Sequence, residues 1–340
     1  MRCRDQLAGA VIAALAVSAA PASAQSAEEF YKGRTVTWVV GSGAGGTYGI
    51  YARIMARGLA KHIPGNPTVV VQHDGAGGGR KAAAFVSNAA PKDGSVIGMT
   101  QQNVPIFHIL KAQGVNFDVS RWQWIGNMAT FGSVLAVWHT APAKTLDAMK
   151  KTEIVVGATG TSSETFMNPT MAEKFLGLKF KIVTGYRGSR PLFKALEQGE
   201  IHGFALSYNS FTVNHADWIR DGLIVFPLQT GFSPEADLKD VPVMWQLGKT
   251  EMDRQAMRLV ASAERFGRSL FAPGGVPADR VAALRAAFDA AMKDEAVVGE
   301  FSKRKLPLDP QPGSEVEKVF RELGAVAPEV VAHAKKTLGL

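Results

Sequence analysis

The amino-acid sequence predicts an α/β fold of two lobes with mostly parallel sheets. Three observations support this prediction. Short apolar runs rich in β-branched residues alternate with segments of helical periodicity, which is typical of βα units. The first two runs are each followed by a glycine-rich loop that opens a helix. Removal of a leader of 24 residues from the 340 leaves 316, more than the ~250–300 residues that one hydrophobic core usually serves.

Residues 1–24 have the pattern of a cleaved export signal. Arg2 and Arg4 form a basic start, residues 7–20 are apolar and uncharged, and a small-x-small triplet ends at Ala24. The apolar run is shorter than the roughly 20 residues that span a bilayer. We therefore expect an exported, periplasmic protein that is released from the membrane.

Composition excludes several classes of chemistry. The single cysteine, Cys3, lies within the expected leader, so the mature chain has neither disulfides nor thiolate sites. The formal net charge of +8 is scattered in small clusters that do not alternate with aromatic residues. Nucleic acid is therefore not an expected partner. A modest positive charge suits an anionic solute through long-range attraction.

The first block of the chain predicts three strand–loop–helix units. β-branched and apolar residues define each strand, and proline or glycine ends each helix. The expected strands are Thr35–Val40, 68–71 and 95–100, and the expected helices are Thr47–His62 and 79–90.

A second block starts near residue 131 and predicts five strands with helices between them. The expected strands are 134–138, 153–157, 179–184, 202–206 and 223–228, and the expected helices are 163–176, Ser189–Glu197 and 211–220. An alanine-rich helix at 279–293 and at least two further helices form a tail. The predicted division is residues 25–125 plus 250–340 in lobe 1 and 126–249 in lobe 2, with the tail packing on lobe 1.

Two glycine-rich loops mark a predicted ligand site. GSGAGG at 41–46 and GAGGG at 75–79 follow the first and second strands, and each opens a helix. Glycine permits close backbone approach, and a helix start offers free N–H groups and a positive dipole end to an anion. Ligands of such sheets bind beyond the carboxyl ends of the strands. The two loops together therefore predict a carboxylate site built from neutral donors.

The first loop also allows a second interpretation. Gly41, Gly43 and Gly46 match G-x-G-x-x-G between a strand and a helix, which is the dinucleotide-binding fingerprint. The alternative is therefore an exported NAD(P)-dependent oxidoreductase. Asp74 lies later than the ~20 residues at which the fingerprint expects its acid, and the second glycine loop serves no purpose in dinucleotide binding. These points favour the carboxylate site.

Motifs along almost the whole mature chain resemble the substrate-binding component of tripartite tricarboxylate transporters, the Bug family. Besides the two glycine loops, they are APKDG at 90–94, GATGTSS at 157–163, GYRGS at 185–189, DVP at 240–242 and APGGVP at 272–277. The resemblance implies a two-lobed periplasmic-binding-protein (Venus-flytrap) fold. It also implies capture of a small carboxylate for membrane permease subunits, by a monomer without catalytic residues or a cofactor.

The resemblance implies which residues bind the ligand. Those of the first lobe are Gly45, Gly46, Thr47, Tyr48, Gly77, Gly78, Gln101, Gln102 and Asn103. Those of the second lobe are Thr159, Thr161, Ser162, Ser163, Tyr186 and Ser207. The family often has an aspartate soon after the first glycine run, which suits an amine-bearing ligand. The stretch after Gly46 here contains no acid, which argues against an amino acid as the ligand.

Catalytic and metal sites are not expected. The seven histidines are dispersed without zinc-site spacing. Ser162 and Ser163 lack the glycine spacing of a hydrolase nucleophile, and one of them is expected to cap the following helix through its side chain, with Glu164 in the first turn. Trp122 and Trp124 are expected in the core. The prediction is a binding protein and not an enzyme.

Overall fold

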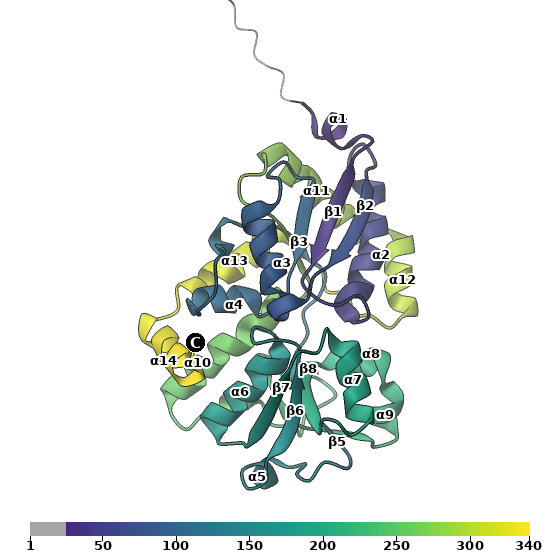
Figure 1. Ribbon diagram of the computed structural model, residues 1–340. Coiled ribbons are helices and arrows are strands. Elements are labelled where there is room, and N and C mark those ends of the chain that lie inside the picture. Colours follow the sequence, from purple (N-terminus) through teal and green to yellow (C-terminus); the bar gives the residue numbers. More distant parts are fainter. Residues whose placement is uncertain (1–24) are drawn as a thin grey trace, which may run out of the picture.

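The computed structural model describes residues 25–340, which form two sheets covered by helices (Figure 1). The expected export signal lies outside the described residues. Within 25–340, no helix combines the length and the apolar character needed to cross a bilayer.

The first sheet has six strands in the order β11-β4-β10-β3-β1-β2. β1 pairs in parallel with β2 and β3, whereas β10 runs antiparallel to β3 and β4. The carboxyl ends of the parallel strands β1 and β2 carry the two glycine loops, as the sequence predicts. Its strands are β1 (Thr35–Val40), β2 (Thr68–His73), β3 (Val96–Met99), β4 (Gln123–Asn127), β10 (Ser269–Ala272) and β11 (Gln311–Pro312).

The second sheet has five strands in the order β7-β6-β8-β5-β9. β6 pairs in parallel with β7 and β8, and β5 runs antiparallel to β8 and β9. Its strands are β5 (Ser133–Trp138), β6 (Ile154–Ala158), β7 (Phe180–Thr184), β8 (Gly203–Ser207) and β9 (Ile224–Gln229).

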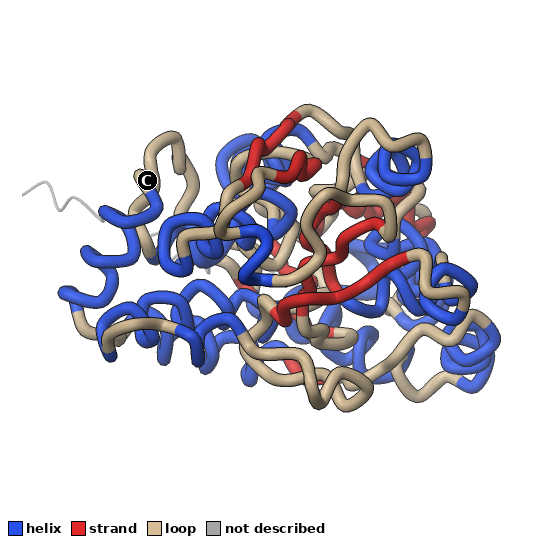
Figure 2. Tube along the Cα trace, turned by 90° about the horizontal axis from the view of Figure 1, so that it is seen from below, coloured by secondary structure: helices blue, strands red, loops and turns tan. Residues whose placement is uncertain are grey.

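Helices surround both sheets, and Figure 2 shows them on either side of the strands. Helix α2 has the predicted bounds, because the apolar side chains repeat at helical spacing and a Pro-Gly turn follows. The helices are α1 (Ala27–Tyr31), α2 (Thr47–His62), α3 (Arg80–Ala84), α4 (Val104–Ile109), α5 (Leu146–Met149), α6 (Glu164–Leu176), α7 (Ser189–Glu197), α8 (Tyr208–Asn214), α9 (Ala216–Arg220), α10 (Glu251–Ala261), α11 (Ala278–Ala291), α12 (Glu295–Lys303), α13 (Gly313–Gly324) and α14 (Pro328–Leu338).

The α/β class and the two-lobed fold are confirmed, but the expectation of mostly parallel sheets needs correction. Four of the described strand pairs are parallel and five are antiparallel. The βα repeats produce the parallel pairs within each sheet. β5 is the first strand after the chain passes from the first sheet to the second, and β10 is the first strand after it returns. Both strands run antiparallel to their neighbours. Both sheets are therefore mixed.

The chain passes between the two sheets after β4 and again between β9 and β10. β4 ends at Asn127, slightly beyond the expected lobe boundary at residues 125–126. Sheet membership follows the predicted order of segments, whereas the exact division into lobes stays a prediction.

The C-terminal tail contacts both halves of the molecule. Helix α13 packs on β4 of the first sheet, as expected for a tail that returns to lobe 1. Helix α14 instead packs on α10 and α6, at the left of Figure 1. Val330, Ala334 and Leu338 form its buried face and pack in a core shared with both neighbours, which explains the difference from the prediction.

The aromatic core of the first lobe lies between β4 and β10. The Trp122 ring stacks on Phe271 with 3.7 Å between ring centres, and Trp124 packs against the edge of the same ring. Both tryptophans are buried. The prediction that they belong to the core is confirmed.

Candidate functional site

A small cavity lies between the two sheets, where the glycine loops of the first lobe meet the helix starts of the second. Its volume is about 20 Å³, room for about one water molecule. Any larger solute therefore requires the lobes to move apart. The lining residues are Ser42, Gly46, Thr47, Tyr48 and Gln101 from the first lobe, and Thr159, Glu164, Thr165, Gly188, Ser189, Leu206 and Ser210 from the second.

The first glycine loop fits closely against the second lobe. A Cβ atom on Gly43 would lie 2.6 Å from the carbonyl oxygen of Arg187, and one on Gly46 would lie 2.6 Å from the Ser189 hydroxyl. Gly45 meets only the side chain of Arg190. None of these three glycines has a positive φ. The glycines in this loop therefore permit the approach of the other lobe, and only Gly46 lines the cavity.

The second loop is rich in glycine for a different reason, which is its backbone conformation. Gly77, Gly78 and Gly79 have φ values of 61°, 68° and 89°, in the left-handed region that favours glycine. A Cβ atom on Gly78 would lie 2.7 Å from the backbone nitrogen of Ser163. The loop thus contacts the start of α6, but Gly77 and Gly78 are not among the residues that line the cavity.

The segment after β3 contributes one lining residue and one bridge between the lobes. Gln101 lines the cavity. The Gln102 amide nitrogen donates to Glu164 (3.1 Å) and lies 3.3 Å from the Ser133 hydroxyl, and the Gln102 backbone N–H donates to the Tyr48 hydroxyl (3.0 Å). Asn103 is buried ahead of α4 and does not line the cavity.

The Gly/Ser-rich segment before α6 reaches the cavity through Thr159, whose N–H donates to the Thr165 hydroxyl (2.9 Å). Thr161 is exposed and accepts a hydrogen bond from Arg80 across the lobe boundary (3.1 Å). Ser162 is fully buried, and its hydroxyl has no hydrogen-bond partner in the part of the chain that the structure describes.

The expected side-chain cap on α6 is absent. Ser163 does occupy the N-cap position, but its side chain makes no capping bond. The Ser163 hydroxyl instead donates to the carbonyl oxygen of Gly160 (2.7 Å). This bond closes the turn that lies against Gly78, so the tight turn competes with the cap for the hydroxyl.

Tyr186 and Ser207, the last two residues predicted to bind the ligand, differ in their surroundings. The Tyr186 hydroxyl donates to Glu200 at 2.5 Å, and Tyr186 does not line the cavity. Burial, together with the Glu200 carboxylate, raises the pKa of Tyr186 to about 12. Ser207 is fully buried, and its hydroxyl lies 3.2 Å from each oxygen of Glu164.

Glu164 is a site residue that the sequence interpretation assigned only to the first turn of a helix. It is the first residue of α6, is 3% exposed and lines the cavity. It accepts hydrogen bonds from Ser133 (2.6 Å) and Gln102. Burial raises the pKa of the Glu164 carboxyl, and the hydrogen bond from Ser133, the charge of Arg268 and the contact with Ser207 lower it in part. The sequence shows that Glu164 follows Gly160 by four residues, but it does not show that the Glu164 side chain points into the cavity.

Arg268 was missed altogether. This fully buried side chain donates from Nη2 to the Thr47 hydroxyl (3.2 Å). The guanidinium carbon of Arg268 lies over the Phe131 ring, 4.8 Å from the ring centre. The Nε atom of Arg268 has no hydrogen-bond partner within residues 25–340. Thr47 in turn lies 3.3 Å from the Ser210 hydroxyl of the second lobe. A positive charge thus lies behind the first-lobe wall of the cavity, where it favours an anion.

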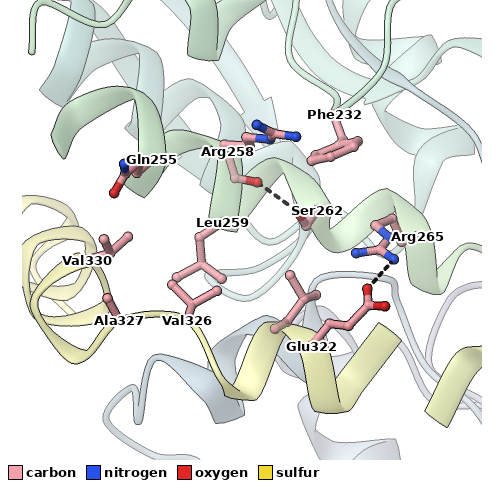
Figure 3. Close-up of a pocket in the computed structure, with 11 residues that line it drawn as sticks. Phe232, Gln255, Arg258, Leu259, Ser262, Arg265, Glu322, Val326, Ala327 and Val330 are labelled. Carbon is pink, nitrogen blue, oxygen red and sulfur yellow. Dashed lines mark hydrogen bonds and ion pairs between the residues drawn. The ribbon is translucent and has the colours of Figure 1, made fainter. Parts of the chain in front are cut away.

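A larger hollow lies on the surface away from this cavity. It has a volume of about 400 Å³ and is shown in Figure 3. Leu259, Val326 and Val330 give it an apolar wall, and an ion pair of 2.8 Å joins Arg265 and Glu322 at its edge. The third charged residue of its lining, Arg258, lies over the Phe232 and Trp245 rings. The interlobe cavity, by contrast, is lined mainly by hydroxyls, backbone and one carboxyl.

Comparison with known proteins identifies the family. Residues 51–315 match the tripartite tricarboxylate transporter family receptor, TctC. This chain belongs to that family. It is therefore a periplasmic solute-binding protein of the tripartite tricarboxylate transporter type, and the resemblance noted from its motifs is confirmed.

Relatives agree with this assignment. The receptor is 29% identical over 292 residues to the "UPF0065 protein in gbd 5'region" of Cupriavidus necator, covering 83% of this chain and 81% of the relative. The solved structure of the periplasmic binding protein BugD is similar, with a TM-score of 0.71 and 19% identity over 90% of this chain and 98% of BugD.

Two further solved structures share the fold. MatC from Rhodopseudomonas palustris with bound malate has a TM-score of 0.66 and 19% identity, over 90% of this chain and 99% of MatC. R. palustris Rpa4515 with adipate has a TM-score of 0.67 and 18% identity, over 90% and 97%.

Proposed function

We propose that this receptor captures a small carboxylate between its two lobes and presents it to the membrane permease subunits of a tripartite transporter. The observation that carries the proposal is the interlobe cavity itself. Thr47, Glu164 and Ser189 begin helices α2, α6 and α7, and all three line the cavity. Helix starts supply N–H donors and positive dipole ends that suit an anion, and Arg268 adds a buried positive charge behind them.

Unpartnered polar atoms near the cavity support binding of a polar ligand. Among residues 25–340, the Ser162 hydroxyl, the Gln102 carbonyl oxygen and both amide atoms of Asn209 are buried without hydrogen-bond partners, in segments whose neighbouring residues line the cavity. Such atoms cost free energy when they stay unpaired. A ligand that satisfies some of them would therefore gain affinity. The malate and adipate bound to MatC and Rpa4515 are consistent with a carboxylate as this ligand.

Capture would proceed by lobe closure. In the closed arrangement Arg80 reaches Thr161, Thr47 reaches Ser210, and Gln102 reaches Glu164, all across the lobe boundary. A ligand that contacts both lobes would bind a closed arrangement, widened enough to admit it, more tightly than an open one and would shift the equilibrium towards closure. We propose that the fifteen residues predicted from the sequence contribute unequally, with Gly46, Thr47, Tyr48, Gln101 and Thr159 nearest the ligand.

The remaining features of the proposal follow from the family. The chain would be exported by a cleaved signal at residues 1–24, would act as a monomer, and would bind its ligand without a cofactor or a catalysed reaction. The dinucleotide alternative for Gly41, Gly43 and Gly46 is disfavoured, because that loop lies against the backbone of Arg187 in the closed form.

Thermal unfolding of the purified protein tests the proposal. A small carboxylate at about 100 times its Kd should stabilise the protein by about 2.7 kcal/mol and raise its melting temperature. NAD(P)H serves as the contrasting ligand. Stabilisation by NAD(P)H together with dehydrogenase turnover, and by none of a panel of carboxylates, would overturn the receptor function.

A further inference from the structure

Glu164 is the one carboxyl group among the residues that line the interlobe cavity. It projects from the second lobe, and its hydrogen bond from Gln102 of the first lobe exists only when the lobes are together. Glu164 lines the cavity and is 3% exposed, so a ligand held there would meet a carboxyl group that is shielded from water. The chemistry of Glu164 therefore limits which ligand groups the cavity accepts.

The partners of Glu164 leave part of its hydrogen-bonding capacity unused. Oε2 accepts from Ser133 and Gln102, whereas Oε1 accepts only from the Ser207 hydroxyl among the described residues, at 3.2 Å. That hydroxyl has a single hydrogen, which it shares with Oε2. A carboxylate accepts about four hydrogen bonds, so Oε1 has room for another donor.

Charge at Glu164 is not neutralised by direct contact. Among residues 25–340, no lysine, arginine or histidine nitrogen lies within 4.0 Å of the Glu164 carboxyl. Arg268 instead bonds to Thr47 and stacks on Tyr48. Burial already disfavours the charged form of Glu164 and raises its pKa. A ligand carboxylate placed against that carboxyl would disfavour the charged form further, whereas a ligand N–H or O–H that donates to it would stabilise the charged form.

We propose that Glu164 selects a small carboxylic acid that also carries a hydroxyl or amino group, and that this group donates a hydrogen bond to the Glu164 carboxyl. The inference rests on the proposed function. The ligand carboxylate would lie towards the starts of α2 and α7, at Thr47 and Ser189, and the donor group towards α6. Unsubstituted dicarboxylates would be discriminated against, because their second carboxylate would face Glu164.

This assignment revises an expectation drawn from the sequence. The stretch after Gly46 lacks an acid, which argued against an amine-bearing ligand. Glu164 supplies a carboxyl to the same cavity from the opposite lobe. An amino group is therefore one of the two donors that the cavity suits, and a hydroxyl is the other.

Calorimetric titration with two matched series of acids tests the proposal. The first series is propionate, 3-hydroxypropionate, 3-aminopropionate and malonate, and the second is butyrate, 4-hydroxybutyrate, 4-aminobutyrate and succinate. Each series holds the carbon chain constant and varies the group at one position. The variants are Glu164→Gln, which removes the charge at constant shape, and Glu153→Gln as a control on an exposed glutamate.

In at least one series, the wild-type protein should bind a donor-bearing acid about ten- to a hundredfold more tightly than the unsubstituted acid and the dicarboxylate. Glu164→Gln should reduce this preference about tenfold and improve binding of the dicarboxylate, whereas Glu153→Gln should match the wild type. Comparison of the hydroxy and amino acids identifies the donor.

Three results would overturn the inference. A wild-type preference for succinate or malonate over the substituted acids would do so, as would ratios in Glu164→Gln that stay within about twofold of the wild type. The wild-type ranking decides the question by itself if the variant does not fold. Failure of every acid in a wider carboxylate panel would overturn the proposed function as well, which separates the two failures.

Discussion

The guanidinium carbon of Arg268 lies 3.7 Å from the centre of the Tyr48 ring. Arg268 is fully buried, and Tyr48 lines the interlobe cavity. Burial raises the pKa of Tyr48 to about 12, although Arg268 opposes the shift. The tyrosine is therefore neutral at physiological pH. A cation stacked on a neutral ring leaves net positive charge beside the cavity, and this charge is available to an anionic ligand.

Replacement of Arg268 by methionine should separate affinity from stability. Arg268→Met keeps much of the side-chain volume and removes the charge. No described carboxylate forms an ion pair with Arg268. Its removal therefore also removes the desolvation cost of a buried charge, and we expect the melting temperature of the free protein to change little. Carboxylate affinity should fall about tenfold or more, because a charged partner is lost. Calorimetric titration measures the affinity.

Arg258→Met is the matched control for that variant. Arg258 also lies over aromatic rings, those of Phe232 and Trp245, but on the exposed face of α10. The Arg258→Met variant should bind carboxylates with the same affinity as the wild type. Unchanged affinity in Arg268→Met would show that Arg268 has a structural role only.

The first glycine loop allows a test of lobe closure. A Cβ atom on Gly43 would lie 2.6 Å from a backbone carbonyl of the opposite lobe, too close for any real contact. Gly43→Ala should therefore oppose closure while leaving the first lobe folded, and should weaken ligand binding about tenfold or more. Small-angle scattering with saturating carboxylate should report a larger radius of gyration than in the wild type.

Gly45→Ala provides the comparison in the same loop. Its Cβ atom would meet only the flexible side chain of Arg190, at 3.2 Å. We expect near wild-type affinity and compaction. If Gly43→Ala and Gly45→Ala behave alike, the contact with Arg187 does not limit closure.

An acid introduced at Gly46 should block carboxylate binding. Gly46 lines the cavity ahead of α2 and lies against Ser189. Gly46→Asp places a carboxylate where the ligand anion is proposed to bind, and we expect binding to fall below detection in a thermal-shift assay. Gly299→Asp adds the same charge on α12, where a Cβ atom has no neighbour within 4 Å, and should bind normally. Unchanged affinity in Gly46→Asp would refute the placement of the anion.

Local patterns in the sequence were sufficient for much of the fold. The bounds of β1, α2 and α7 agree with prediction, because each has a clear periodicity and lies beside glycine or proline. Strands β4 and β10 were not predicted. They are short and pair with each other in antiparallel register from distant parts of the chain, with Leu270 opposite Gly126. No local pattern specifies such a pairing.

The site shows the same contrast between local features, which could be predicted, and contacts between distant residues, which could not. Thr47 and Gly46 could be predicted because a glycine loop and a helix start adjoin in sequence. Arg268 could not, because its partner Thr47 is 221 residues away. Glu164 lay within a recognised motif, but its role depends on Ser133 and Ser207 of neighbouring strands. A buried polar cluster built from several elements becomes visible only when the chain is folded.

A second buried carboxyl, Glu264, predicts how stability depends on pH. It accepts hydrogen bonds from the backbone N–H groups of Phe232 (2.7 Å) and Ser233 (2.8 Å), and so joins the segment after β9 to the segment before β10. Burial, with a smaller contribution from the nearby Glu235, raises the pKa of Glu264 to about 7, although the hydrogen bonds from Phe232 and Ser233 oppose the shift. In the unfolded chain the pKa of a glutamate is about 4.3.

Because the folded state binds the proton more tightly, the stabilising contribution of Glu264 is fully present below pH ~4.3 and is lost as pH rises through about 7. Its share of the free energy of unfolding should fall by on the order of 1–3 kcal/mol between pH 5 and pH 8. Glu264→Gln cannot titrate, so its melting temperature should vary less over this range than that of the wild type. Glu153→Gln should retain the wild-type slope. Parallel pH profiles for Glu264→Gln and the wild type would contradict the assignment, since the other titrating groups are common to both proteins.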